Sequence, residues 1–184
     1  VGPFGRSLFV QDQREPMATT NFKGSPVKLQ GELPAVGSTV PNIRFVKDDL
    51  SEADLASLRG NVVVLFAMPS VDTGICALET KAFNQKIDGL GAMAVAISED
   101  LPFAMKRFCA AEGIANVVVA SDFRYHDMSE KFGVRMLEGP LAGLHARVVF
   151  VLDKEGVLRY TQLVPDITQE PDYEAVLDAV KKLL

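Results

Sequence analysis

The stretch Val62-Val63-Val64-Leu65-Phe66 is an apolar run rich in β-branched residues, with no polar residue alternating along it. Such a run is typical of a strand buried on both faces of a sheet. Pro69 ends the run. A helical pattern follows from about Gly74 to Lys86, with an apolar stripe formed by Ile75, Leu78, Ala82 and Phe83. The sequence therefore predicts a central strand that leads directly into a helix.

The alternation of strands and helices continues toward the C-terminus. Further strands are predicted at 92–97, 117–119, 145–152 and 157–164. Helices are predicted after Pro102, at 127–132 and at 171–184. The last two strands are joined by the tight turn Asp153-Lys154-Glu155-Gly156. This order predicts one α/β domain with a mixed central sheet and helices on both faces.

Capping residues indicate where some of these helices begin and end. Ser98 or Asp100 is a candidate N-cap for the helix that carries Pro102 in its first turn, and Gly113 stands just past its end. Gly133 follows the next predicted helix and suits its C-terminal stop.

The N-terminal part carries shorter elements. A β-hairpin around Gly24-Ser25-Pro26 is predicted within 21–32, and a short strand is expected at 43–46. Ser51–Leu58 is predicted as a short helix capped by Ser51. Residues 1–16 have no periodicity, so we expect a disordered or cloning-derived extension there. The expected organisation is this extension, a hairpin at 17–33 and the main domain at 34–184.

Composition narrows the classes of function. The chain has 184 residues, 48% of them apolar, and a net charge of −5. Because phosphate neutralisation needs clustered Lys and Arg, a role in nucleic-acid binding is not expected. The longest apolar stretch, Val62–Met68, is too short for a membrane span, and with no recognisable export signal we expect a cytoplasmic protein. The absence of a nucleotide-binding glycine motif predicts no organic cofactor.

The segment Pro69-Ser70-Val71-Asp72-Thr73-Gly74-Ile75-Cys76 lies where the buried strand gives way to the helix. If Thr73 is the N-cap, Cys76 occupies the third helical position, where free backbone N–H groups and the helix dipole favour an anion. Such a site lowers the pKa of a thiol. The Thr73 hydroxyl is also placed to donate to the sulfur, and Pro69 would shape the approach to it.

Each of these residues also has an ordinary structural interpretation. A buried cysteine is most often a small hydrophobic residue, and a lone threonine at this position is simply a helix cap. Arg147, at the edge of the apolar strand predicted at 145–152, would by itself be a strand-end arginine that reaches solvent. In combination, however, a thiolate and a guanidinium indicate a site that stabilises developing negative charge.

Pro69, Thr73 and Cys76 together form the pattern Pro-x-x-x-Thr-x-x-Cys, which resembles the active-site signature of peroxiredoxins. The full string at 69–76 is similar to that of bacterial thiol peroxidases, the atypical two-cysteine subgroup. The likeness extends from about Phe22 to Leu184 and includes Pro-Ala-Val-Gly at 34–37.

The resemblance implies a thioredoxin-like fold and an antioxidant enzyme that reduces hydrogen peroxide and alkyl hydroperoxides. It implies that Cys76 is the peroxidatic cysteine, that Cys109 is the resolving cysteine which closes a disulfide with it, and that Arg147 is the active-site arginine. Thioredoxin as reductant and a homodimer are implied as well. Since Cys76 begins one helix and Cys109 lies late in another, we expect one of these helices to unwind locally before a disulfide forms.

Three other functions remain open at this level. A Cys–His hydrolase would need His126 or His145 beside Cys76, although His126 lies in a polar loop and a strand-end histidine such as His145 is usually structural. A redox sensor would use the same disulfide without rapid turnover. A zinc site made of the two cysteines and two histidines is disfavoured, because the sequence has no closely spaced cysteine pair.

Overall fold

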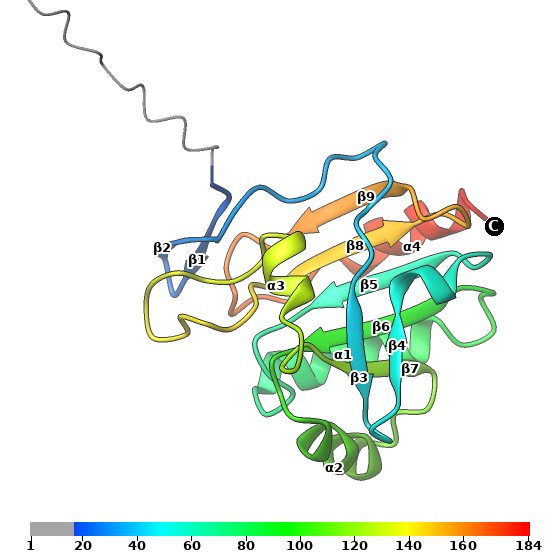
Figure 1. The fold of residues 1–184 in the computed structure, drawn as a ribbon, viewed down its shortest axis with the longest axis horizontal. Coiled ribbons are helices and arrows are strands. Elements are labelled where there is room, and N and C mark those ends of the chain that lie inside the picture. Colours follow the sequence, from blue (N-terminus) through cyan, green and yellow to red (C-terminus); the bar gives the residue numbers. More distant parts are fainter. Residues whose placement is uncertain (1–16) are drawn as a thin grey trace, which may run out of the picture.

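The computed structural model describes residues 17–184, so the extension expected at residues 1–16 lies outside the described part. The described chain forms a two-stranded hairpin and a seven-stranded sheet with the order β4-β3-β7-β6-β5-β8-β9 (Figure 1). The strands are β1 (Thr19–Phe22), β2 (Ser25–Lys28), β3 (Arg44–Lys47), β4 (Glu52–Asp54), β5 (Val63–Ala67), β6 (Met93–Ser98), β7 (Val117–Ser121), β8 (Val148–Leu152) and β9 (Leu158–Leu163). The helices are α1 (Gly74–Lys86), α2 (Pro102–Glu112), α3 (Asp127–Lys131) and α4 (Tyr173–Lys181), with a 3-10 helix at Leu55–Leu58.

The predicted mixed sheet is confirmed. β5 runs parallel to β6 and antiparallel to β8, so that Leu65 lies opposite Val95 on one side and Phe150 on the other. β7 continues the parallel part beside β6, and β9 continues the antiparallel part beside β8. The ends of β5, β6 and β7 therefore open at the same edge of the sheet, and the loops that follow these strands lie close together.

Both faces of β5 are covered, which explains why its sequence has no polar alternation. Val63 and Leu65 face a core that also holds Phe132 beside α3. Val64 and Phe66 face a second core, to which α1, α2 and α4 contribute residues such as Phe83, Met105 and Val176. Figure 1 shows α3 on the near face of the sheet and α1 and α4 on the far face. The predicted helix layers on both faces are therefore present.

The N-terminal hairpin turns earlier than its sequence indicated. Lys23 and Gly24 are the two turn residues, with φ angles of 49° and 82°, whereas Ser25 and Pro26 already belong to β2. A two-residue turn with positive φ at both positions matches the natural twist of paired strands. The turn therefore lies at Lys23-Gly24 instead of at the predicted Gly24-Ser25-Pro26.

The helix predicted at Ser51–Leu58 is wrong in its first half. Residues from Glu52 pair with β3 as β4, and helical turns begin only at Leu55. Asp54, not Ser51, caps them by accepting a bond from the Ser57 N–H at 2.9 Å. Ser51 bonds to Asp49 within the preceding turn instead. The open edge of β3 offered these residues a strand partner that the local sequence could not reveal.

The start of α2 was also predicted wrongly. Its N-cap is Leu101, which makes no side-chain capping bond. Ser98 donates to Asp100 at 2.6 Å, and the Asp100 carboxylate is directed toward the loop after β5 rather than toward α2. The predicted C-terminal stop is confirmed, because Gly113 adopts a left-handed conformation with φ 66°.

Two C-terminal elements are shorter than predicted. The strand expected from residue 145 begins at Val148, since His145 forms only an isolated bridge with Arg135. The final helix begins at Tyr173 because Asp172 caps it, accepting a bond from the Ala175 N–H at 3.1 Å. None of the helices within residues 17–184 is both long enough and apolar enough to cross a membrane.

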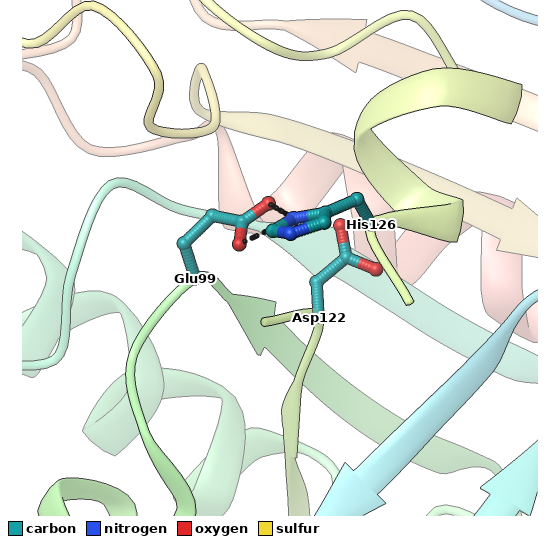
Figure 2. Close-up of side chains that lie close together, drawn as sticks. All are labelled: Glu99, Asp122 and His126. Atoms are coloured by element: carbon teal, nitrogen blue, oxygen red, sulfur yellow. Dashed lines mark hydrogen bonds and ion pairs between the residues drawn. The ribbon is translucent and has the colours of Figure 1, made fainter. Parts of the chain in front are cut away.

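A buried polar network ties the ends of β6 and β7 to the segment before β8. Glu99 and Asp122 follow these two strands, and His145 Nε2 lies 3.0 Å from Asp122 Oδ2 and 2.9 Å from Ser129 Oγ. Figure 2 shows Glu99 paired with His126 beside Asp122. Burial by itself lowers the pKa of His145, but its bonds to Asp122 and Glu99 outweigh burial and raise it to about 9. The raised pKa favours the protonated form of His145, which pairs with both carboxylates and so links the two loops.

Replacing Gly133 by alanine should destabilise the fold more than the same change at Gly113. Both glycines have nearly equal positive φ, 69° and 66°, so both alanines incur a left-handed penalty of about 1–2 kcal/mol. A Cβ at Gly133 would also stand 2.8 Å from the Glu32 carbonyl oxygen, whereas nothing lies within 4 Å at Gly113. Urea unfolding of both variants measures the difference; equal losses in the free energy of unfolding would contradict the packing argument.

The His145 network should make stability depend on pH in the alkaline range. Because the folded-state pKa of about 9 exceeds the ordinary value of 6.5, the contribution of His145 is complete below about pH 6.5. It is lost as pH rises through 9. We expect a steeper fall in the free energy of unfolding from pH 6.5 to 9 in the wild type than in His145→Gln. His126→Gln, which leaves the His145–Asp122 pair in place, is the control, and a His145→Gln slope as steep as the wild type would refute the assignment.

Candidate active site

Cys76 lies in the first turn of α1, directly after the loop that follows β5. Thr73 caps this helix as predicted: its Oγ1 accepts a bond from the Cys76 N–H at 3.3 Å. The Thr73 hydroxyl donates to the Ser70 carbonyl oxygen at 3.2 Å, rather than turning toward the sulfur. The sulfur thus lies in the first turn of α1, near the positive end of the helix dipole.

The loop between β5 and α1 is fixed by Asp100. This carboxylate accepts bonds from the Ser70 hydroxyl at 2.7 Å and from the Val71 N–H at 2.8 Å. Ser98 completes its set of partners. Asp100 was expected, as an alternative to Ser98, to cap α2, but it caps no helix. The overlooked signal was an acidic residue two positions after β6, the strand that runs parallel to β5. Asp100, in the loop that follows β6, therefore fixes the conformation of the loop that leads to Cys76.

Arg147 meets Cys76 from the segment that precedes β8. Its Nη2 donates to the Cys76 sulfur at 3.4 Å and to the Ile167 carbonyl oxygen at 3.0 Å, and its Nε donates to the same carbonyl. Nη1 forms an ion pair with Glu79. The side chain of Arg147 is only 1% exposed, so the alternative of a solvent-directed arginine is excluded. The structure brings together the thiol and the guanidinium that the sequence placed 71 positions apart.

Glu79 is the site residue that sequence reasoning missed. It follows Cys76 by three positions, hence lies on the same side of α1, and its side chain is fully buried. Burial raises the pKa of Glu79 to about 7, although Arg147 works in the opposite direction. An acidic residue one helical turn after the cysteine was the available signal, but such residues are usually exposed.

An open, mostly apolar groove of about 540 Å³ borders the start of α1. Pro69 and Thr73 line it, together with Phe22 from the hairpin, Ile75 and Ile167. Cys76 itself has no exposed surface and belongs to the core beneath the groove. Pro69 is buried and lines this groove, and its role in shaping the approach to the sulfur stays a prediction.

Cys109 lies on α2 and packs against the core that contains Cys76. Both cysteines are free thiols in this structure. Burial, with a further contribution from the Asp48 carboxylate, raises the pKa of Cys109 to about 11. The Cys109 thiol is therefore protonated near neutral pH in this conformation.

The two histidines lie elsewhere. His145 bonds to Asp122, Ser129 and the Ile97 carbonyl oxygen. The side chain that donates to the Cys76 sulfur is Arg147, not a histidine. His126, expected to be solvated, is part-exposed and paired with Glu99. A histidine-activated cysteine therefore has no geometric support.

Within residues 17–184, the residues grouped closely enough to hold a metal ion are Glu99, Asp122 and His126 (Figure 2). Neither cysteine belongs to this group. Asp122 already accepts bonds from the Met128 and Ser129 N–H groups and pairs with His145. Its oxygens are committed to the protein, so this cluster gives no argument for a metal centre.

The chain is similar to known proteins over most of its length. The family model described as Redoxin matches residues 35–177. A thiol peroxidase of Leptospira interrogans is 47% identical over 171 residues, covering 91% of this chain and 100% of that protein. A thiol peroxidase of Mycobacterium tuberculosis is 44% identical, covering 89% of this chain and 99% of that protein.

Solved structures agree with these relatives. A peroxiredoxin-like protein from Aquifex aeolicus superimposes with a TM-score of 0.87 at 48% identity, covering 91% of this chain and 99% of that one. A thiol peroxidase from Chromobacterium violaceum shares the fold with a TM-score of 0.80 at 21% identity, covering 89% and 95% of the two chains. With a Redoxin match over most of its length and thiol peroxidases as near relatives, the chain belongs to the thiol peroxidases of the Redoxin family.

Proposed function

We propose that this protein reduces hydrogen peroxide and alkyl hydroperoxides with Cys76 as the attacking thiolate. The observation that carries the proposal is the contact of 3.4 Å between Arg147 Nη2 and the Cys76 sulfur at a helix start. A buried guanidinium beside a thiol stabilises the thiolate over the neutral form. The same cation is in place to stabilise charge on a peroxide oxygen.

The chemical step follows from this arrangement. The thiolate electron pair forms a bond to one peroxide oxygen while the O–O bond breaks. Cys76 becomes a sulfenic acid, and the other oxygen leaves with the bonding electrons and takes up a proton to give water or an alcohol. Arg147 and the first N–H groups of α1 are fixed before the reaction, so no reorganisation is needed as negative charge moves onto the leaving oxygen.

The groove beside α1 supports organic hydroperoxides as substrates in addition to hydrogen peroxide. Its walls include Phe22, Ile75, Leu78 and Ile167. An alkyl chain placed there would remove apolar surface from water, at about 25 cal/mol per Å² buried. Hydrogen peroxide gains nothing from such walls, so the groove favours substrates with an apolar tail.

Cys109 is the proposed resolving residue. Its thiol would attack the sulfenic sulfur, forming the disulfide and releasing water, and a dithiol such as thioredoxin would then reduce the disulfide by exchange. Because Cys76 is fully buried and both cysteines lie within helices, part of α1 or α2 must open first. Opening would also hydrate Cys109 and lower its raised pKa, which favours the attacking thiolate.

The remaining parts of the proposal concern partners and location. A homodimer is supported by exposed apolar side chains that line one hollow around the start of α2, namely Leu50, Leu101, Phe103 and Phe123. A cytoplasmic location is retained because recycling requires a compartment where dithiols are kept reduced. A redox sensor would use the same residues, and only slow turnover with thioredoxin would favour it.

Cysteine variants test the proposed cycle. Cys76→Ser should abolish peroxide reduction in an assay coupled to thioredoxin, since no other cysteine lies beside Arg147 in residues 17–184. Cys109→Ser should reduce a single equivalent of peroxide and then stop, because the sulfenic acid has no internal partner. Full turnover by Cys109→Ser would assign resolution to another thiol, and peroxide reduction by Cys76→Ser would overturn the proposed function.

Arg147→Lys should lower kcat/KM for peroxide by about 10²-fold, the typical effect of losing one preorganised donor to developing charge. The guanidinium reaches Glu79, Ile167 and Cys76 from separate nitrogens of a rigid plane, whereas an ammonium has all its donors on one nitrogen and does not reproduce this geometry. Arg159→Lys is the matched control, because that arginine forms a part-exposed pair with Asp153. Stopped-flow peroxide reduction gives both rates; similar rates for the two variants would count against a role of Arg147 in the chemistry.

A further inference from the structure

Glu79 is a buried acid that the proposed cycle does not use. One carboxylate oxygen, Oε2, pairs with Arg147 Nη1. The other, Oε1, is buried and has no hydrogen-bond partner. A carboxylate oxygen left in this state is costly when it is charged, because desolvation penalises an anion far more than a neutral acid. The geometry therefore favours a proton on Glu79.

The charges around Glu79 point the same way. Arg147 is the cation that faces it, and this guanidinium also serves Cys76. From the loop before α4 Glu170 adds a negative charge, and Tyr173 of α4 contributes a neutral phenol bonded to Glu170. One positive charge thus faces two buried acids. If both acids were ionised, the buried group would carry a net charge of −1.

We propose that Glu79 is a positioning residue that holds, through Arg147, the proton that Cys76 gives up. Glu79 is protonated while Cys76 is a thiolate, and it ionises when the sulfur loses its charge. Arg147 couples the two acids, because each anion weakens the hold of the guanidinium on the other. This inference rests on the proposed role of Cys76 as a thiolate.

The coupling keeps the site neutral through the peroxide step. Before reaction the charges are Arg147 positive, Cys76 negative and Glu79 neutral. As the S–O bond forms and the O–O bond breaks, the leaving oxygen gains a proton, and Glu79 releases one. Afterwards the sulfenic acid is neutral and the Glu79 carboxylate alone balances Arg147. No buried net charge is created at either stage, which avoids the cost of an unpaired ion in the core.

The test measures protons released when Cys76 is alkylated with iodoacetamide, in a Cys109→Ser background so that a single thiol reacts. At about pH 8, above the pKa of about 7 that Glu79 has beside a neutral sulfur, a pH indicator should report close to one proton per modified Cys76, even where thiolate absorbance shows that the sulfur was already ionised. The thioether is neutral, so Glu79 then ionises. Glu79→Gln keeps a side-chain oxygen that can accept a bond from Arg147, but it cannot ionise. This variant should therefore release no protons when Cys76 is alkylated.

Glu174→Gln is the charge-matched control. It removes a carboxyl group from an exposed pair with Lys86, where the side chain is 75% exposed, and this variant should release as many protons as the parent. The proposal would be overturned if Glu79→Gln and the parent released equal numbers of protons. It would also be overturned if the parent showed full thiolate absorbance before alkylation and then released no protons. These two results would leave the peroxidase function intact.

A second measurement avoids any dependence on the folding of Glu79→Gln. In the protein with glutamate at position 79, the infrared band of a protonated carboxyl group should be present before alkylation and lost afterwards. An unchanged carboxyl band would overturn the proposal. Absence of a Cys76 thiolate at this pH would overturn this inference, whereas the proposed function is tested independently by the peroxide assay of Cys76→Ser.

Discussion

The buried guanidinium of Arg147 is the charge on which the site depends. Arg147 is only 1% exposed, and a charge buried to this degree is tolerated only with close polar partners, which each of its three nitrogens has. Its partners come from two separate parts of the chain: Cys76 and Glu79 on α1, and the Ile167 carbonyl in the loop between β9 and α4. The bonds of this one guanidinium therefore fix the positions of the start of α1, the segment before β8 and the loop before α4 relative to one another.

The sheet topology makes this meeting possible. β8 pairs antiparallel with β5, with Val148 opposite Ala67, so the residue just before β8 reaches the same edge as the helix that follows β5. Much of this was predictable from local signals. An unbroken β-branched run gave β5, and threonine followed by a helical stripe gave the start of α1 and the position of Cys76. Arg147 was found because a charge beside an apolar strand is unusual.

The parts that sequence did not predict depend on tertiary partners. Asp100 has the spacing of a helix cap, but Ser70 and Val71 on a neighbouring loop compete for its carboxylate and prevail. Residues 52–54 look helical until the free edge of β3 is present to pair with them. Glu79 follows the pattern of a surface acid, and only the buried arginine across the sheet edge explains it. Local patterns predict elements well and predict long-range polar partners poorly.

The same edge of the sheet holds two polar groupings with opposite character. Around His145, carboxylates, hydroxyls and backbone N–H groups satisfy one another, which favours a rigid junction between β6, β7 and the chain before β8. Around Arg147, the sulfur has one weak donor and Glu79 retains an unpaired oxygen. A fully satisfied network resists rearrangement, whereas an incompletely satisfied one loses little when a helix start opens. We therefore expect movement during the cycle to be confined to the helices that carry the cysteines, while the His145 junction keeps Arg147 in place.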